Sequence, residues 1–374
     1  MAMLLLFLTC TSHAAELHVQ TLDFVGKNAS GQTLAKGQVK LPYVVAIQAA
    51  DEKVARNIND RLFIEQFNAL APRPLNAAVG AANGLVIDGT ASQSFKIMRN
   101  DGRVLSITLD AEGCGAYCEG YQSSHSFDAA TGQLLTAYQL FSPAGQRAIS
   151  QRMGLHASQL YKKQLRALAK ESKTTTEDVE DRIALNESCL QQALETKRTP
   201  LADNAFNLRI ELSNHHLLLE RGRCSNHAMR SLDDVGDITL VLPYQDVAQH
   251  LSAYGKALLL DATSNPLNTS SLPAEPLFGQ LLRGNIGEVA ITMLVKKDNN
   301  NVIRGHYYYD KYGKSIELQG SQRGQSIELV ETPENPNGEA KPAADMKLTR
   351  SGNQLTGQWI SRTKLKTQVV RLTP

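Results

Sequence analysis

A proline-rich segment divides this chain into two parts with different sequence patterns. Residues 261–277 contain three prolines among serine, threonine and asparagine residues, a composition typical of a linker. The chain has 374 residues, which is too long for one average domain. We therefore predict one domain over residues 15–260 and a second, smaller domain over residues 278–374.

The sequence after the linker consists almost entirely of short strands. Segments rich in β-branched and aromatic residues recur roughly every ten positions and are separated by glycine-containing turns. The segments begin near Glu288, Val302, Ser315, Ser326, Asp345, Gln354 and Gln368. This spacing predicts a small all-β antiparallel barrel or sandwich.

Aromatic residues in this second part indicate which strand faces are buried. Tyr307 and Tyr309 would share one face of their strand, while Tyr308 points to the other. We expect one of these two sets to lie in the core. We also expect the single tryptophan, Trp359, to be a core residue, because large aromatic side chains dominate burial.

The sequence before the linker mixes helices with strands. Residues 16–48 have the composition of strands, and apolar residues recur at every fourth position of residues 50–63, as on one face of a helix. Ser142 precedes a proline, which is a common helix start, and we expect helices through much of residues 143–196. Strands and helices come in runs and do not alternate strictly. We therefore predict an α+β domain with an antiparallel sheet.

The first residues have the pattern of a secretory signal peptide. An apolar run over residues 3–8 leads into Ser12-His13-Ala14, which fits the small-x-small cleavage rule. We expect residues 1–14 to be removed, although this leader is short and has no basic residue at its start, so an earlier start is an open alternative. No later stretch has the roughly 20 apolar residues of a membrane-spanning helix. We expect a periplasmic or secreted protein with no membrane span after cleavage.

Four cysteines remain once Cys10 is removed with the leader: Cys114, Cys118, Cys189 and Cys224. An even number of cysteines in an exported chain favours disulfides. Four cysteines permit three pairings, which sequence alone does not distinguish. We favour Cys114–Cys118 with Cys189–Cys224, because the first pair is local and Gly115 relaxes the turn between its members.

The segment around Cys114 and Cys118 is compatible with three kinds of site. Together with His125, the two thiolates would supply three ligands to a zinc ion. As free thiols they could form a redox pair, but such pairs normally have two residues between the cysteines, and here there are three. Export favours the disulfide, which would fix the shape of a loop. We therefore expect neither a metal nor a cofactor.

A loop held in this way would present side chains suited to contact with a partner. Tyrosines give a large contact area at a low cost in conformational entropy, and carboxylates add negative charge. We predict a binding surface formed by Glu112, Tyr117, Glu119, Tyr121, His125 and Asp128. The alternative is that the two tyrosines pack on the sheet.

Sequence motifs for catalysis or nucleic-acid binding are lacking. The chain has no Gly-x-Ser-x-Gly elbow, no His-Glu-x-x-His and no phosphate-binding loop, so we name no catalytic residue. The net charge is +2 and the basic residues are spread along the chain. Without a dense basic patch that alternates with aromatic residues, we expect no nucleic-acid partner.

Three segments of the first part carry a resemblance to a known family. They are Asn57-Ile58-Asn59 in a helix, the "SFDAATGQLLTAYQLF" stretch over residues 126–141, and the "ITLVLPY" strand over residues 238–244. Over about residues 40–255 the chain resembles a domain of unknown function that forms the extracellular part of lysozyme-sensing anti-sigma factors and precedes some peptidoglycan deacetylase domains. The chain shows no transmembrane anchor and no deacetylase domain, so we expect neither of those two roles.

The resemblance implies non-catalytic binding at the cell envelope, with lysozyme, another envelope protein or a peptidoglycan-related glycan as the partner. Because a lysozyme is strongly basic, acidic residues of the predicted surface would steer its approach. Two alternatives stay open. An enzyme acting on peptidoglycan or polysaccharide would have a cleft with convergent polar groups and perturbed pKa values. A small-ligand protein would have a wide cavity in the C-terminal barrel.

Overall fold

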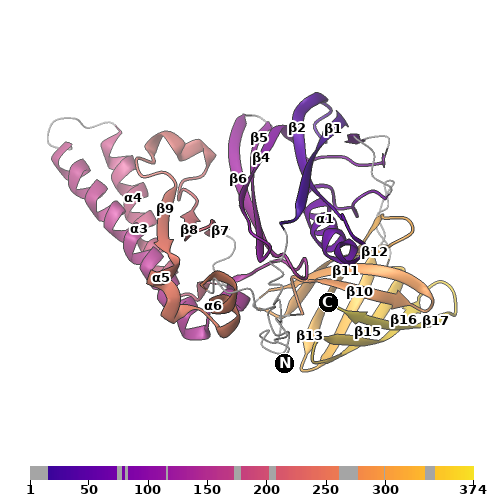
Figure 1. The fold of residues 1–374 in the computed structure, drawn as a ribbon. Coiled ribbons are helices and arrows are strands. Elements are labelled where there is room, and N and C mark those ends of the chain that lie inside the picture. The colour runs from indigo at the N-terminus through magenta and orange to yellow at the C-terminus, as the bar shows by residue number, and fades with distance from the viewer. Residues whose placement is uncertain are drawn as a thin grey trace, which may run out of the picture.

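The computed structural model describes residues 16–73, 78–80, 83–114, 117–171, 178–201, 208–260, 277–298, 300–332 and 342–374. These residues form a six-stranded sheet, a three-stranded sheet and a closed barrel, together with several helices (Figure 1). The predicted α+β class with a C-terminal β-barrel is therefore confirmed. The predicted leader, residues 1–14, and residues 261–276 of the predicted linker lie outside the described residues.

The six-stranded sheet has the order β3-β1-β2-β4-β5-β6. Its strands are β1 (His18–Lys27), β2 (Thr33–Val45), β3 (Ala78–Gly80), β4 (Thr90–Asn100), β5 (Val104–Cys114) and β6 (Cys118–Asp128). The β1–β3 and β2–β4 pairs are parallel and the other pairs are antiparallel, so the sheet is mixed rather than purely antiparallel.

Helix α1 (Glu52–Phe67) covers one face of this sheet. Ile58 and Leu62, on its predicted apolar face, pack against Leu105 and Ile107 of β5. Because side chains alternate between the two faces of a strand, the odd-numbered residues of β5 face α1 and the even-numbered residues face away from it. The same alternation separates the functional side chains described below.

A helical hairpin packs on the three-stranded sheet, which has the order β7-β8-β9 (Figure 1). The elements of this region are α2 (Ala137–Leu140), α3 (Pro143–Glu171), α4 (Val179–Thr196), β7 (Leu208–Leu212), β8 (His216–Arg221), the 3-10 helix η4 (His227–Leu232), β9 (Ile238–Pro243), α5 (Tyr244–Val247), η5 (Ala248–His250) and α6 (Ala253–Leu259). Helix α3 begins where the sequence predicts, since the Ser142 hydroxyl accepts a hydrogen bond from the amide of Gly145.

The C-terminal region is a closed antiparallel barrel in which each strand pairs with the next and β10 pairs with β17. Its strands are β10 (Leu281–Ile286), β11 (Val289–Lys297), β12 (Val302–Tyr309), β13 (Ser315–Arg323), β14 (Ser326–Thr332), β15 (Ala344–Ser351), β16 (Gln354–Ser361) and β17 (Thr367–Thr373). Gly320 allows close strand approach, since an added Cβ would lie 1.9 Å from the carbonyl oxygen of Glu328.

Side chains fill the interior of the barrel. Met293, Tyr307, Leu318 and Val370 belong to one buried cluster, which also includes Leu277 from the end of the predicted linker. Figure 1 shows the barrel lying against α1, so that this helix is placed between the sheet and the barrel. Among the described residues, no helix is long and apolar enough to cross a membrane.

Candidate functional site

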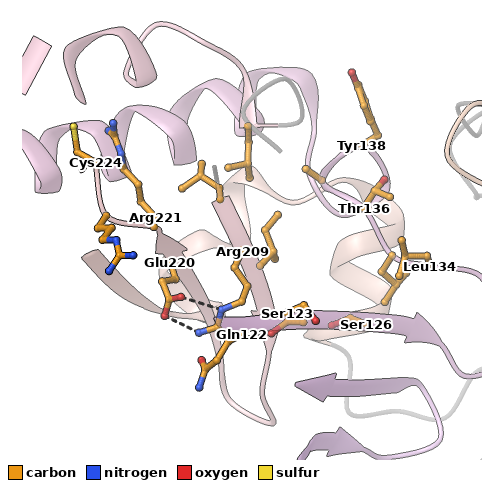
Figure 2. Close-up of a pocket in the computed structure, with 18 of the residues that line it drawn as sticks. Gln122, Ser123, Ser126, Leu134, Thr136, Tyr138, Arg209, Glu220, Arg221 and Cys224 are labelled. Atoms are coloured by element: carbon orange, nitrogen blue, oxygen red, sulfur yellow. Dashed lines mark hydrogen bonds and ion pairs between the residues drawn. The ribbon is translucent and has the colours of Figure 1, made fainter. Parts of the chain in front are cut away.

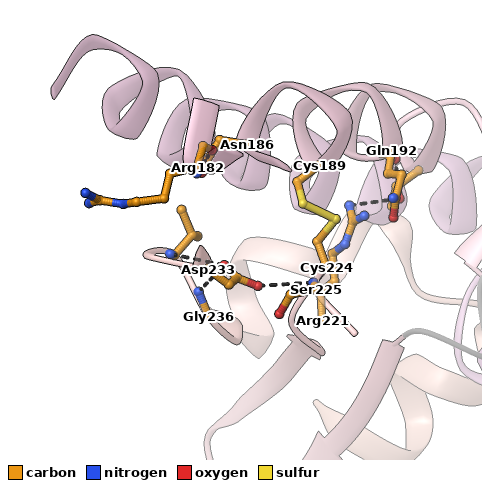
Figure 3. Close-up of a disulfide and its surroundings, with 11 residues drawn as sticks. Arg182, Asn186, Cys189, Gln192, Arg221, Cys224, Ser225, Asp233 and Gly236 are labelled. Carbon is orange, nitrogen blue, oxygen red and sulfur yellow. Dashed lines mark hydrogen bonds between the residues drawn. A yellow bond between two sulfur atoms is a disulfide. The ribbon is translucent and has the colours of Figure 1, made fainter. Parts of the chain in front are cut away.

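The turn between β5 and β6 is closed by the Cys114–Cys118 disulfide. The two cysteines are register partners at the ends of their strands, so the bond joins the last pair of the ladder. Cys189 and Cys224 form the second disulfide, between α4 and the loop after β8 (Figure 3). Both bonds have the pairing that we favoured from the sequence. Among the described residues, no group of three or more His, Cys, Asp and Glu side chains is placed to hold a metal ion.

The end of the β5–β6 hairpin is anchored to the loop that follows β8. Glu119 forms an ion pair with Arg223, and its carboxylate lies 3.1 Å from Nδ1 of His227, within hydrogen-bond distance. The ring of Tyr117 lies over the His227 ring, with 4.7 Å between the centroids, yet 70% of Tyr117 remains exposed. These contacts hold a tyrosine in a defined position at the surface.

Tyr121 is the fourth residue of β6, and its side chain points to the side of the sheet that α1 covers. Its hydroxyl is 3.0 Å from Oγ1 of Thr90, and 47% of the residue is exposed. It borders a cavity of about 560 Å³ that is also lined by Glu65, Ser123 and His125. Two residues of the predicted binding surface, Tyr121 and His125, therefore line this cavity.

His125 connects a serine to a carboxylate in this cavity. Its Nδ1 is 3.0 Å from Oε2 of Glu65, and its Nε2 is 3.3 Å from Oγ of Ser123. Ser123 and His125 share a strand face because they are two residues apart. The order serine, histidine, carboxylate is the arrangement in which a base activates a nucleophile and a third group orients the base.

Glu65 is held in its ionised form. Burial alone would raise the pKa of this carboxyl, but the nearby guanidinium of Arg61 and the hydrogen bond from His125 lower the pKa to about 2. Arg61 Nε donates to Oε1 of Glu65 at 2.6 Å, so each carboxylate oxygen has its own partner. An ionised carboxylate favours the His125 tautomer that carries its proton on Nδ1.

The opposite side of the sheet carries an acidic groove of about 730 Å³. Its carboxylates come from the two sheets, namely Asp110 and Glu112 of β5, Glu220 of β8, and Asp237, which precedes β9. Lys40 also lines the groove. Glu112 is exposed, and no cation pairs with it in the described part of the chain.

Asp128 does not belong to this surface. It is only 2% exposed and lies at the other end of β6, where its carboxylate accepts a hydrogen bond of 2.6 Å from the hydroxyl of Tyr254. Its role is to join the sheet to α6. The structure therefore brings four of the predicted residues to one end of the hairpin, namely Glu112, Tyr117, Glu119 and Tyr121. His125 lies beside them and is mostly buried, and Asp128 is separated from them.

A third cavity, of about 700 Å³, lies between β6, the β7–β8 pair and the C-terminal part of α4 (Figure 2). Arg209 spans its floor, where it donates to Glu220 at 2.7 Å and to Glu211 at 3.0 Å. Glu211 also accepts a hydrogen bond from Thr108 of β5, so this network ties the two sheets together. The sequence gives no signal for this cavity, because its walls come from segments about 100 residues apart.

No protein-family model and no curated protein sequence matches the chain. Among solved structures, the chain is similar to the crystal structure of a member of the DUF3298 family from Bacteroides fragilis. The two sequences are 12% identical, the alignment covers 65% of this chain and 96% of that chain, and the TM-score is 0.37. A superposition as loose as this one carries no argument about function.

Proposed function

We propose that this protein is an exported, non-catalytic binding protein of the cell envelope, and that the end of the β5–β6 hairpin recognises a basic protein such as a lysozyme. The observation that carries the proposal is the pair of exposed tyrosines, Tyr117 and Tyr121, on a hairpin fixed by a disulfide and by the ion pair of Glu119. Rigid tyrosines provide contact area with little loss of side-chain entropy on binding.

The acidic groove supports a basic partner. Four carboxylates and one lysine line it. Asp110 is paired with Lys96 and Glu220 with Arg209, whereas Glu112 is exposed and has no cation partner among the described residues. Such a surface attracts lysine and arginine side chains and increases the association rate, an effect that salt screens. The charge is local, because the net charge of the whole chain is +2.

Export is supported by the two disulfides, which form and persist in oxidising compartments. It agrees with the leader-like pattern of residues 1–14 and with the resemblance to lysozyme-sensing extracellular domains. The proposal takes the partner from that resemblance and the surface from the structure.

The test is a calorimetric titration of the mature protein with a c-type lysozyme, using Tyr117→Ala and a matched control. Tyr312→Ala is that control, since Tyr312 is a 67% exposed tyrosine on the barrel. We expect micromolar or tighter binding that Tyr117→Ala weakens by about tenfold, as for a contact tyrosine, and that Tyr312→Ala leaves unchanged. Absence of binding, or equal effects of the two substitutions, would remove this proposal.

A second candidate function, hydrolysis of ester-linked acyl groups, rests on the Ser123–His125–Glu65 series. In this reaction Ser123 Oγ would form a bond to the acyl carbon, His125 Nε2 would take the serine proton and pass it to the leaving alcohol, and water would then release the acid. A fluorophosphonate probe tests it by mass spectrometry of the labelled peptide, with Ser321→Ala as the control for Ser123→Ala. If Ser123 is not labelled, the catalytic alternative fails and the binding function stands.

A further inference from the structure

Arg221, the last residue of β8, is a buried cation that has no counter-charge among the described residues. It is 4% exposed, and among the described residues its guanidinium has one hydrogen-bond partner, Oγ1 of Thr196 at 3.1 Å. Figure 3 shows it reaching towards α4, beside Gln192 and the Cys189–Cys224 disulfide. A buried charge is unfavourable unless it is paired, and burial correspondingly lowers the pKa of this arginine.

The neighbouring arginines differ from Arg221 in this respect. Arg209 forms ion pairs with Glu211 and Glu220, and Arg223 forms one with Glu119. Arg209 and Arg223, which border the cavity, thus each have a carboxylate partner. Arg221, the most buried of the three arginines, has none in the described part of the chain.

A second unpaired polar group is electrostatically coupled to Arg221. The side chain of Tyr161, on α3, is fully buried, and its hydroxyl has no hydrogen-bond partner among the described residues. Burial raises the pKa of Tyr161 to about 12, and the positive charge of Arg221 opposes that rise. A buried hydroxyl without an acceptor and a buried guanidinium without a carboxylate partner, among the described residues, therefore interact beneath the α3–α4 hairpin.

Arg221 is among the residues that line the cavity between β6, β8 and α4, and its guanidinium lies on the side of that cavity nearest Cys224 (Figure 2). About half of the remaining wall is apolar and includes Leu134, Leu201 and Ile210, and the polar half includes the ion pair of Arg209 with Glu220. A volume of about 700 Å³ is within the range of small-molecule sites. Among the described residues, the wall thus combines one positive charge that has no carboxylate partner with an apolar part.

We propose that this cavity binds an amphipathic anion. Its carboxylate or phosphate group pairs with the guanidinium of Arg221, and its apolar part contacts Leu134, Leu201 and Ile210. A planar guanidinium presents paired donors that match either oxyanion, which is why both head groups fit. The site adjoins the acidic groove, with which it shares Gln122 and Glu220, but it includes neither Tyr117 nor Tyr121, so the two proposals are tested independently.

The probes are octanoate and octyl phosphate, titrated separately into the full-length mature protein by calorimetry. Octyl glucoside, which has the same chain and no charge, is the ligand control. We expect one or both anions to bind, octyl glucoside not to bind, and Arg221→Met to reduce anion affinity by about tenfold or more. The arginine control is Arg304→Met, because Arg304 is an exposed barrel residue. The relative affinities of the two anions distinguish a carboxylate ligand from a phosphate ligand.

Thermal stability provides a second readout, which separates a ligand-binding arginine from a structural one. Replacing an unpaired buried cation by an apolar side chain of similar length should leave the melting temperature unchanged or raise it. The anions should stabilise the wild-type protein and not Arg221→Met. No binding of either anion at millimolar concentration overturns the proposal. Anion binding by Arg221→Met with the affinity of the wild type also overturns it, as does a large loss of stability in that variant without ligand.

Discussion

Arg283 of the barrel donates a hydrogen bond of 2.9 Å to Asp60 of helix α1, and Asp60 is completely buried. The same carboxylate accepts hydrogen bonds from Arg73 and from the amide of Ala71. Arg283 also donates to Asn57 of α1. One buried carboxylate thus connects the helix of the six-stranded sheet to the barrel.

Asp60→Asn should lower the free energy of unfolding by about 3 kcal/mol, because it leaves the mostly buried guanidinium of Arg283 and the partly exposed one of Arg73 without their counter-charge. Denaturant unfolding measures this change, with Trp359 fluorescence reporting on the barrel and circular dichroism on the helices. Glu328→Gln, on the exposed face of β14, is the control and should have no effect. An Asp60→Asn protein as stable as the wild type would show that the ion pair does not hold α1 to the barrel.

The Glu65 carboxylate should make stability depend on acid pH. Its pKa is lowered from 4.5 to about 2 in the folded protein, so its contribution is complete above about pH 4.5 and is lost as the pH falls towards 2. Over that range Glu65→Gln should show a flatter dependence of unfolding free energy on pH than the wild type, by about 2 kcal/mol in total. Glu52→Gln, at the exposed start of the same helix, should retain the wild-type slope.

The two disulfides should differ in their contribution to stability. Cys189 and Cys224 are 35 residues apart, whereas Cys114 and Cys118 are only 4 apart. Closing a longer loop removes more entropy from the unfolded chain. Replacing Cys189 and Cys224 by serine should therefore cost about 2 kcal/mol more stability than replacing Cys114 and Cys118. Thermal unfolding of the two double variants measures the difference, and an equal loss would contradict it.

The short disulfide should matter for binding instead. We expect Cys114→Ser with Cys118→Ser to keep the fold and to weaken lysozyme binding, because the tip that carries Tyr117 loses its fixed shape. Circular dichroism and calorimetry on the same sample measure both effects. If this double variant unfolds, the disulfide is needed for the fold, and the reason for proposing that it fixes a binding surface is lost.

Much of the fold follows from local sequence pattern. The alternation of apolar residues predicts the strands of the barrel, although β10 and β4 were not predicted. Strand β10 is short and contains Gly284, and β4 has several polar residues that obscure its alternation. We expected either the Tyr307 and Tyr309 set or Tyr308 to lie in the core; Tyr307 and Tyr308 are both fully buried, and Tyr309 is partly buried. Tyr307 points into the barrel and Tyr308 packs under α1, where its hydroxyl donates to Asn68.

Trp359 is partly exposed at the end of the barrel, where it packs against the core. Its Nε1 donates to Glu331, which also accepts from Tyr307. A buried carboxylate that binds two aromatic donors could not be predicted from pattern, because the three residues come from three different strands.

The candidate site shows the limit of sequence reasoning most clearly. The run from Cys118 to Asp128 predicts one surface, but it forms a single strand of 11 residues, so its ends lie roughly 30 Å apart. That distance separates Asp128 from the tyrosines. Glu65 contacts His125 although the two are far apart in sequence. Arg221 is distinguished by having no carboxylate partner among the described residues, which no motif reports.

Hydrogen–deuterium exchange with and without a c-type lysozyme tests the central claim most directly, because it locates the contact as well as detecting it. We predict slower exchange in peptides that cover residues 117–127, which include most of β6, and residues 223–232, which contact Glu119. We predict unchanged exchange in β13 to β16 of the barrel. Moderate salt should reduce the slowing. No change in exchange anywhere, or slowing confined to the barrel, would contradict recognition of a basic protein by the β5–β6 hairpin.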